Sequence, residues 1–249
     1  METDKIETYV FMDLSCEYGN TRVLTGICLR AATRSDILIK TGSLPEPILS
    51  LRFEKLDLSS CTEIREFINQ QKPPVCLIAH NGFRFDFIIL KYHFDQLQFR
   101  LTDDVQCADS ILAFYDIDKA INKEVKAQNA AKIRVQKLRC FKNNFLKQPT
   151  LNTKQVEMAP ENTPITENST SEFDYVYEEV SFRRQLVQLQ EYYRRWVGSP
   201  QIVPHPPEND TEMLFRIANK FGKRFLDWVE QNHQSFNSVE GKLVEFGYE

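Results

Sequence analysis

The sequence predicts an α/β protein, and three observations support that class. Short apolar runs alternate with longer segments in which apolar residues recur every three or four positions, the pattern of strands followed by helices. Two of the apolar runs end in polar residues, as strands do where α/β sheets carry their sites. The chain has 249 residues, of which 42% are hydrophobic. This size suits one domain with a tail or an insert.

The first half of the chain predicts three consecutive strands and then two strand–helix pairs. The strands are expected at 6–14, 22–32, 35–40, 75–79 and 105–107. Helices are expected from residue 62 to the Pro73-Pro74 pair, over 85–99, and from residue 110 onward. The prolines stop the first helix, and apolar residues at helical spacing define the second.

The second half predicts helices joined by irregular segments. A basic helix is expected over 117–145 and a disordered, Pro/Thr/Asn-rich insert over 148–171. Further helices are expected over 173–196 and 211–231, the last capped by Asp210 or Thr211, after a rigid proline-rich linker at 200–207. The chain thus divides into a core at 1–146, an insert at 147–172 and a helical part at 173–249 that completes the core.

The helix at 117–145 and the lysine that follows it form the most basic part of the chain. Its basic residues are Lys119, Lys123, Lys126, Lys132, Arg134, Lys137, Arg139, Lys142 and Lys147. The net charge of the whole chain is −4, so any contact to nucleic acid must be local. Two interpretations stay open: a solvated surface helix, or a contact to a nucleic-acid backbone.

The composition also indicates in which cellular compartment the protein is expected. The six cysteines form no C-x-x-C pair, and reduced, buried thiols are expected for those inside apolar runs. The first residues are polar and charged, unlike a signal peptide. No apolar run reaches the ~18 residues that a membrane span needs. We expect a soluble protein of the cytoplasm or nucleus, with no membrane partner.

Three segments carry polar residues in a characteristic order. Residues 8–14 are TYVFMDL, residues 79–87 are AHNGFRFDF, and residues 107–112 are CADSIL. Over residues 5–118 the chain resembles the three-prime repair exonuclease branch of the DnaQ-like (DEDDh) 3′→5′ exonucleases. That family has F-x-D-L-E-x-T-G, A-H-N-G-x-R-x-D-F and C-x-D-S-L at these places.

The resemblance implies an RNase H-like fold with a mixed sheet of about five strands and helices on both faces. It implies Mg²⁺ or Mn²⁺ held by four carboxylates, of which Asp13 and Asp86 match two, and a histidine base. It also implies single-stranded DNA 3′ ends as substrate, DNA rather than RNA, and a homodimer through the edge strand at 35–40.

Other motif positions depart from the family. Ser15 stands where the second carboxylate is expected. The best match to the late H-S-A-E-G-D segment is at 237–242, which puts Asn237 at the base and Lys242 at the last carboxylate. Asn cannot take a proton and Lys cannot bind Mg²⁺ as a ligand. His233 lies four residues before this segment, and the residue five positions after it is Ser238, which is not acidic.

Several residues remain open as replacements or substrate contacts. Glu17, Glu240 or Asp109 could rebuild a metal site, although Asp109 is better explained as the N-cap of the next helix. Arg84 and Asn81 are the substrate-binding candidates, since a guanidinium suits phosphate. The alternatives for Arg84 and Asn81 are a structural ion pair and a hydrogen bond to the neighbouring loop.

Two functions follow from the resemblance. One is a catalytically impaired, metal-dependent 3′→5′ exonuclease that binds nucleic-acid 3′ ends. The other is a pseudonuclease, a binding or scaffolding protein that needs no cofactor.

Overall fold

The computed structural model describes residues 5–17, 23–39, 43–145, 182–198 and 206–241. The chain divides into two compact units, Met1–Asp118 with Phe182–Glu249, and Lys119–Ser181. The first unit contains the sheet. The insert predicted at 147–172 lies outside the described residues. None of the described helices is both long and apolar enough to cross a membrane.

The sheet confirms the predicted fold class, with six strands in the described part of the chain. Their order across the sheet is β3-β2-β1-β4-β5-β6. The strands are β1 (Thr8–Glu17), β2 (Val23–Thr33), β3 (Ile48–Arg52), β4 (Val75–Ala79), β5 (Gln106–Asp109) and β6 (Gln234–Ser235). Strands β1, β4 and β5 run parallel, whereas β2, β3 and β6 pair antiparallel to their neighbours. This mixed order is that of an RNase H-like sheet.

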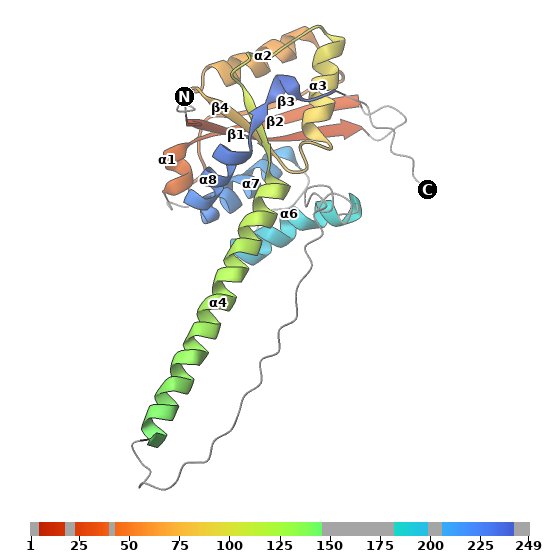
Figure 1. Cartoon of the computed structure of the whole chain (residues 1–249). Helices are drawn as coiled ribbons and strands as arrows, with labels where there is room; N and C mark the ends of the chain where they lie inside the picture. The colour runs from red at the N-terminus through yellow and green to blue at the C-terminus, as the bar shows by residue number, and fades with distance from the viewer. Residues whose placement is uncertain (1–4, 18–22, 40–42, 146–181, 199–205, 242–249) are drawn as a thin grey trace, which may run out of the picture. The chain divides into compact units, whose positions relative to one another are not determined.

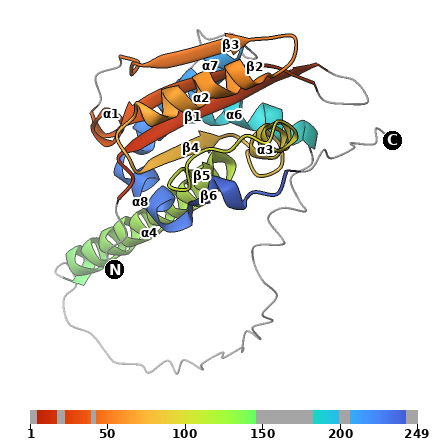
Figure 2. The same ribbon diagram turned by 90° about the horizontal axis from the view of Figure 1, so that it is seen from above.

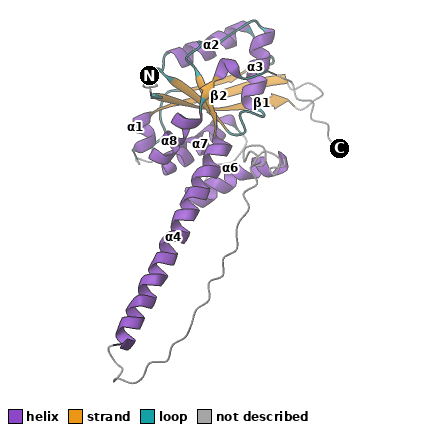
Figure 3. Ribbon diagram, in the orientation of Figure 1, coloured by secondary structure: helices purple, strands orange, loops and turns teal. Residues whose placement is uncertain are grey.

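Helices cover both faces of the sheet, as Figures 1 and 2 show and as Figure 3 repeats by type of secondary structure. The helices are α1 (Arg34–Leu38), α2 (Leu58–Asn69), α3 (Asp86–Gln96), α4 (Ser110–Phe145), α6 (Phe182–Trp196), α7 (Pro207–Phe221), α8 (Lys223–Asn232) and the 3-10 turn η1 (Phe236–Ser238). Helices α2 and α3 lie on one face, and α7 and α8 lie on the other (Figure 1).

Side chains of β1 pack on both faces of the sheet, because successive side chains along a strand point to opposite faces. Val10 and Met12 belong to the core cluster that also contains residues of α2 and α3. Phe11 points the other way, and its ring centroid lies 5.8 Å from that of Phe215 in α7 and 6.2 Å from that of Phe225 in α8. Asp13 lies two residues beyond Phe11 and so faces α7.

The strand predicted at 35–40 is wrong, because these residues begin a helix. Thr33 and Asp36 form a capping box: the Asp36 N–H donates to Thr33 Oγ1 over 3.2 Å, and the Thr33 N–H donates to Asp36 over 2.7 Å. This box starts α1 and overrides the strand preference of the apolar run that follows. The outer strand on this side is β3, so a dimer through an edge strand at 35–40 loses its basis.

The helix predicted at 211–231 is two helices. It begins earlier, at Pro207, and it breaks at Gly222, whose φ is 56°. Proline suits the first helical position, where its missing N–H is not needed. The early start places Asp210 in the first turn of α7 rather than in front of the helix.

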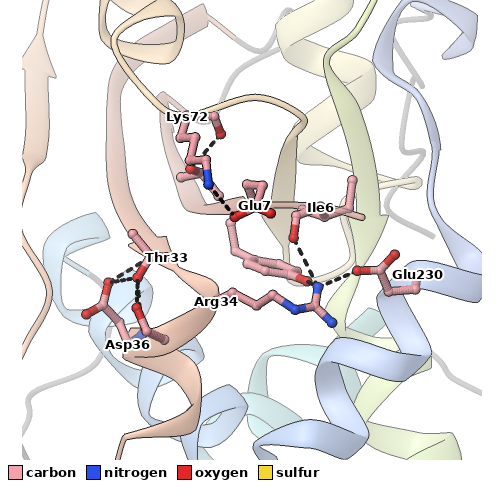
Figure 4. A network of polar contacts seen from close by, with 10 residues as sticks. Ile6, Glu7, Thr33, Arg34, Asp36, Lys72 and Glu230 are labelled. Atoms are coloured by element: carbon pink, nitrogen blue, oxygen red, sulfur yellow. Dashed lines mark hydrogen bonds and ion pairs between the residues drawn. The ribbon is translucent and has the colours of Figure 1, made fainter. Parts of the chain in front are cut away.

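A polar network fastens the N-terminal end of β1 to α8 (Figure 4). One guanidinium nitrogen of Arg34 donates to the Ile6 carbonyl over 3.0 Å, to the Tyr9 hydroxyl over 3.1 Å and to the Glu230 carboxylate. This network lies at the end of β1 opposite to Asp13.

Candidate carboxylate site

The polar loop between β4 and α3 is folded around Asp109. One carboxylate oxygen of Asp109 accepts the backbone N–H groups of Asn81 (3.0 Å) and Ile111 (2.9 Å), and the other accepts that of Phe83 (3.2 Å). The bond to Ile111 caps α4, as predicted. Burial, partly offset by these amides, raises the Asp109 pKa to about 6. Asp109 therefore holds the loop instead of offering a free ligand.

Local geometry explains the residues of this loop. Asn81 has a φ of 67°, a left-handed conformation that asparagine tolerates better than most residues. A Cβ at Gly82 would lie 2.4 Å from the Phe87 ring, so only glycine fits there. His80 Nδ1 is 2.9 Å from Ser110 Oγ. His80 and the Asn81 backbone therefore contact Ser110 at the start of α4 and Asp109 at the end of β5.

The two matching carboxylates, Asp13 and Asp86, interact electrostatically. Asp13 is half-buried near the end of β1, and Asp86 is 2% exposed at the start of α3. Burial raises the pKa of Asp13, and the negative charges of Asp86 and Asp210 raise it further. Burial and the charge of Asp109 raise the pKa of Asp86. Hydrogen bonding to the Leu14 N–H lowers the pKa of both carboxyl groups and so opposes these shifts.

Asp210 is a third carboxylate, which the sequence interpretation missed. It lies in the first turn of α7, and its charge raises the pKa of both Asp13 and Asp86. The signal was present: residues 205–210 are HPPEND, with His, Glu and Asp at the spacing of the family's H-S-A-E-G-D. The prolines made this segment resemble a linker. His205 itself lies outside the described residues.

The late segment predicted at 237–242 does not supply the site. The Asn237 side-chain amide donates to the Leu101 carbonyl (3.2 Å) and to Asp103 (2.9 Å), beside β5. His233 pairs with Gln106 at 3.1 Å. Assigning Asn237 to the base position was therefore wrong, because a better-spaced segment precedes α7. Lys242 lies outside the described residues.

Ser15 is the remaining departure within the described motif positions. It lies two residues after Asp13 and therefore on the same face of β1. Its cross-strand partner is Gly26, which adds no side chain above it. A register shift follows between Ser15 and Cys16, but the extra residue, Thr25, is in β2, so β1 is not shortened. Glu17 stays exposed at the strand end and does not fill the position of Ser15.

The other candidates lie in different surroundings. Arg84 is half-buried, and its positive charge lowers the pKa of Asp109. Glu240 is exposed. Gly241, next to it, packs against α3, where an added Cβ would lie 2.7 Å from the Tyr92 backbone nitrogen. A substrate contact by Arg84 or Asn81 stays a prediction.

The donor chemistry of Asp13, Asp86 and Asp210 fits a hard divalent cation. Carboxylate oxygens are preferred ligands of Mg²⁺ and Mn²⁺, and a cation would relieve the repulsion that raises these pKa values. Within the described residues, no three His, Cys, Asp or Glu side chains already form a metal-holding group. Binding would therefore require the carboxylates to move closer together.

Comparisons with known proteins agree with the N-terminal motifs. The chain is 32% identical over 88 residues to human three prime repair exonuclease 2, covering 35% of this chain and 37% of that protein. It is 35% identical over 65 residues to the mouse protein, covering 26% of this chain and 28% of the relative. The chain thus spans about a third of the length of these curated relatives. No known family profile matches it.

Structural comparison gives weaker likenesses. The E. coli exonuclease I–single-stranded DNA complex, in its zinc-bound form, overlaps with a TM-score of 0.35 at 11% identity, covering 46% of this chain and 30% of that one. A second structure of exonuclease I overlaps with a TM-score of 0.33 at 10% identity, covering 45% of this chain and 29% of that one.

Proposed function

Because this chain is a relative of the three-prime repair exonucleases, we propose that it is a divalent-metal-dependent 3′→5′ exonuclease of reduced activity that acts on single-stranded DNA ends. The observation that carries the proposal is that the charges of Asp86 in α3 and Asp210 in α7 both act on Asp13 in β1. The loss of one motif carboxylate, at Ser15, is the reason to expect reduced activity.

Each residue has a distinct role in this proposal. Asp13, Asp86 and Asp210 would hold Mg²⁺ or Mn²⁺, which supplies Lewis-acid activation of water and neutralises the leaving oxygen. His205 has the motif spacing of a general base, a group that accepts a proton from water. Ser15 can accept a hydrogen bond but brings no charge, so cation binding should be weaker than with a fourth carboxylate.

The exposed part of α4 supports a nucleic-acid contact. Lys119, Lys123, Lys126 and Lys132 are all exposed, and Val125 is 48% exposed. The sequence from 119 to 147 carries nine basic residues and one acidic residue, in a chain of net charge −4. A phosphate backbone is the partner that this charge suits. We propose that this helix adds affinity for DNA without sequence preference.

A pseudonuclease is the second candidate. It is favoured by the same absence of a preformed metal-holding group among the described residues and by Ser15. On that alternative, Asp13 persists as a polar group near the end of β1 and Asp86 as one at the start of α3, and the protein binds a partner without cleavage. Turnover separates the two candidates.

A homodimer, if it forms, would use β3 instead of the segment at 35–40. Strand β3 is the outermost strand on its side, and its Ile48, Leu49 and Leu51 are half-buried. An edge strand offers unpaired backbone groups to a second copy. The cytoplasm or nucleus remains the proposed location.

The deciding experiment is incubation of the full chain with 5′-labelled single-stranded DNA and Mn²⁺ or Mg²⁺. We expect stepwise shortening from the 3′ end, at a turnover below about 1 s⁻¹, the low end of ordinary enzymes. Asp210→Asn should abolish it. The charge-matched control Asp227→Asn removes an exposed partner of Lys223 on α8 and should change nothing. Cleavage that survives Asp210→Asn, or no cleavage with either metal, would reject the proposal.

A further inference from the structure

One row of side chains crosses the sheet under the first turn of α7. The register of β1 with β2 pairs Asp13 with Cys28, and that of β2 with β3 pairs Cys28 with Ser50. Residues directly opposite one another in antiparallel strands have their side chains on the same face. Asp13, Cys28 and Ser50 therefore form a row on the face that α7 covers.

The first turn of α7 contacts this row at two points. Glu208 accepts a hydrogen bond from the Ser50 hydroxyl. Thr211 Oγ1 lies 3.4 Å from Cys28 Sγ, and both residues are fully buried. Asp210 lies between Glu208 and Thr211 in the sequence and belongs to the same first turn.

We infer that Ser50 and Cys28 are positioning residues: they dock the first turn of α7, which carries Asp210, onto the row of side chains that contains Asp13. The inference rests on the proposed function, since the placement of Asp210 matters for catalysis only if Asp13 and Asp210 serve one cation. The turn has no side-chain cap of its own, because Pro206 occupies the N-cap position. Side-chain contacts from Ser50 and Cys28 join this turn to the sheet.

The Ser50 contact also determines where the Glu208 charge lies. The Ser50 hydrogen bond is the main cause that lowers the pKa of Glu208. Arg52 Nη2 lies 3.7 Å from the same carboxylate, on the same strand. Glu208 thus stays ionised and directed toward β3. Since Ser50 is neutral, replacing it changes the docking without changing the net charge of the site.

The test compares Ser50→Ala with Ser50→Thr, which keeps the hydroxyl. We expect Ser50→Ala to raise the Mn²⁺ concentration for half-maximal cleavage by about tenfold, the low end of the effect of losing an outer-shell partner. The KM for DNA at saturating Mn²⁺ should not change, and Ser50→Thr should restore the cation requirement. The control Ser238→Ala removes a hydroxyl bonded to the Ser235 carbonyl at 2.6 Å, near the other sheet edge, and should match the unmodified protein.

An unchanged Mn²⁺ requirement in Ser50→Ala, or a change in KM alone, would overturn the inference. A second readout does not need cleavage: hydrogen–deuterium exchange of the backbone amides in the first turn of α7. If Ser50→Ala releases this turn, these amides should exchange faster than in the unmodified protein. An inactive unmodified protein would reject the proposed function, while the exchange measurement still tests the docking. Unchanged exchange in both Ser50→Ala and Cys28→Ser would reject the docking.

Discussion

Replacing Asp109 by alanine should destabilise the protein by about 3–7 kcal/mol, because it removes a helix cap and two further hydrogen bonds to backbone amides. The loss of the α4 cap contributes ~1 kcal/mol, and each of two further buried amides left without an acceptor contributes ~1–3 kcal/mol. Those amides belong to Asn81 and Phe83, at 3.0 and 3.2 Å from the carboxylate. This loss is a large part of the ~5–15 kcal/mol stability of an ordinary domain.

The variant Asp109→Asn tests the roles of the two carboxylate oxygens separately. The remaining carbonyl oxygen can still accept from Asn81 and Ile111, whereas the new NH₂ group faces the Phe83 N–H. One amide is lost, so the expected cost is about 1–3 kcal/mol. The assay is urea unfolding at pH 8, above the Asp109 pKa of about 6.

Asp57→Ala is the matched control, because Asp57 caps α2 through the Ser60 N–H. It should cost less than Asp109→Ala. Equal losses for the Asn and Ala variants of Asp109 would refute the account of its two oxygens. A large rise in the Mn²⁺ requirement of Asp109→Asn, with stability unchanged, would show that Asp109 is a ligand and not a structural group.

Three further outcomes are expected. Burial raises the pKa of Asp13 and Asp86, so the native state holds the protons of these two carboxyl groups more tightly than the unfolded chain does. The two groups stabilise the native state fully below the ordinary carboxyl pKa of ~3.9, and this stabilisation is lost as pH rises through their folded-state pKa values. Melting temperatures measured from pH 5 to 9 should therefore decline. Mn²⁺ should offset the decline, and Asp13→Asn should make it shallower. A decline of unchanged steepness in Asp13→Asn would contradict the attribution of this pH dependence to Asp13. Ser15→Glu should lower the Mn²⁺ concentration that cleavage requires, and an unchanged requirement would mean that position 15 lies outside the site. Phe236→Ala should cost about 3–5 kcal/mol in denaturant unfolding, since this fully buried ring packs edge-on against Phe87 in the core under α3, and a cost below ~1 kcal/mol would place η1 outside that core.

The sequence was sufficient for β1, β2 and β4 because these strands are buried and rich in apolar residues, whereas β3 at 48–52 and β6 at 234–235 were not predicted. The strand predicted at 75–79 matches β4, and those at 6–14 and 22–32 match β1 and β2 within three residues at each end. The segment at 35–40 failed because strand preference in an apolar run is a weak signal. The stronger local signal was Thr33 three residues before Asp36, a pair that nucleates a helix.

The site was harder to predict because its residues belong to different parts of the chain. Asp13 and Asp86 lie in motifs that resemble a family, so the sequence could bring them together. Asp210 follows two prolines, and prolines suggest a linker unless one occupies the first turn of a helix. The sheet register that aligns Cys28 and Ser50 under α7 is a property of the tertiary structure, and no sequence motif predicts it.

Ser15 links stability and function at this site. Without a cation, each added carboxylate raises the repulsion that the native state must bear. The charges of Asp86 and Asp210 already add to the burial that raises the pKa of Asp13. A neutral serine lowers that repulsion but removes a ligand charge. Ser15→Glu should therefore lower the melting temperature without metal and enlarge its rise with Mn²⁺, because a cation stabilises only the state that binds it. If the metal-free melting temperature is unchanged, position 15 does not share the electrostatic environment of Asp13, and the weak-site explanation for this chain is wrong.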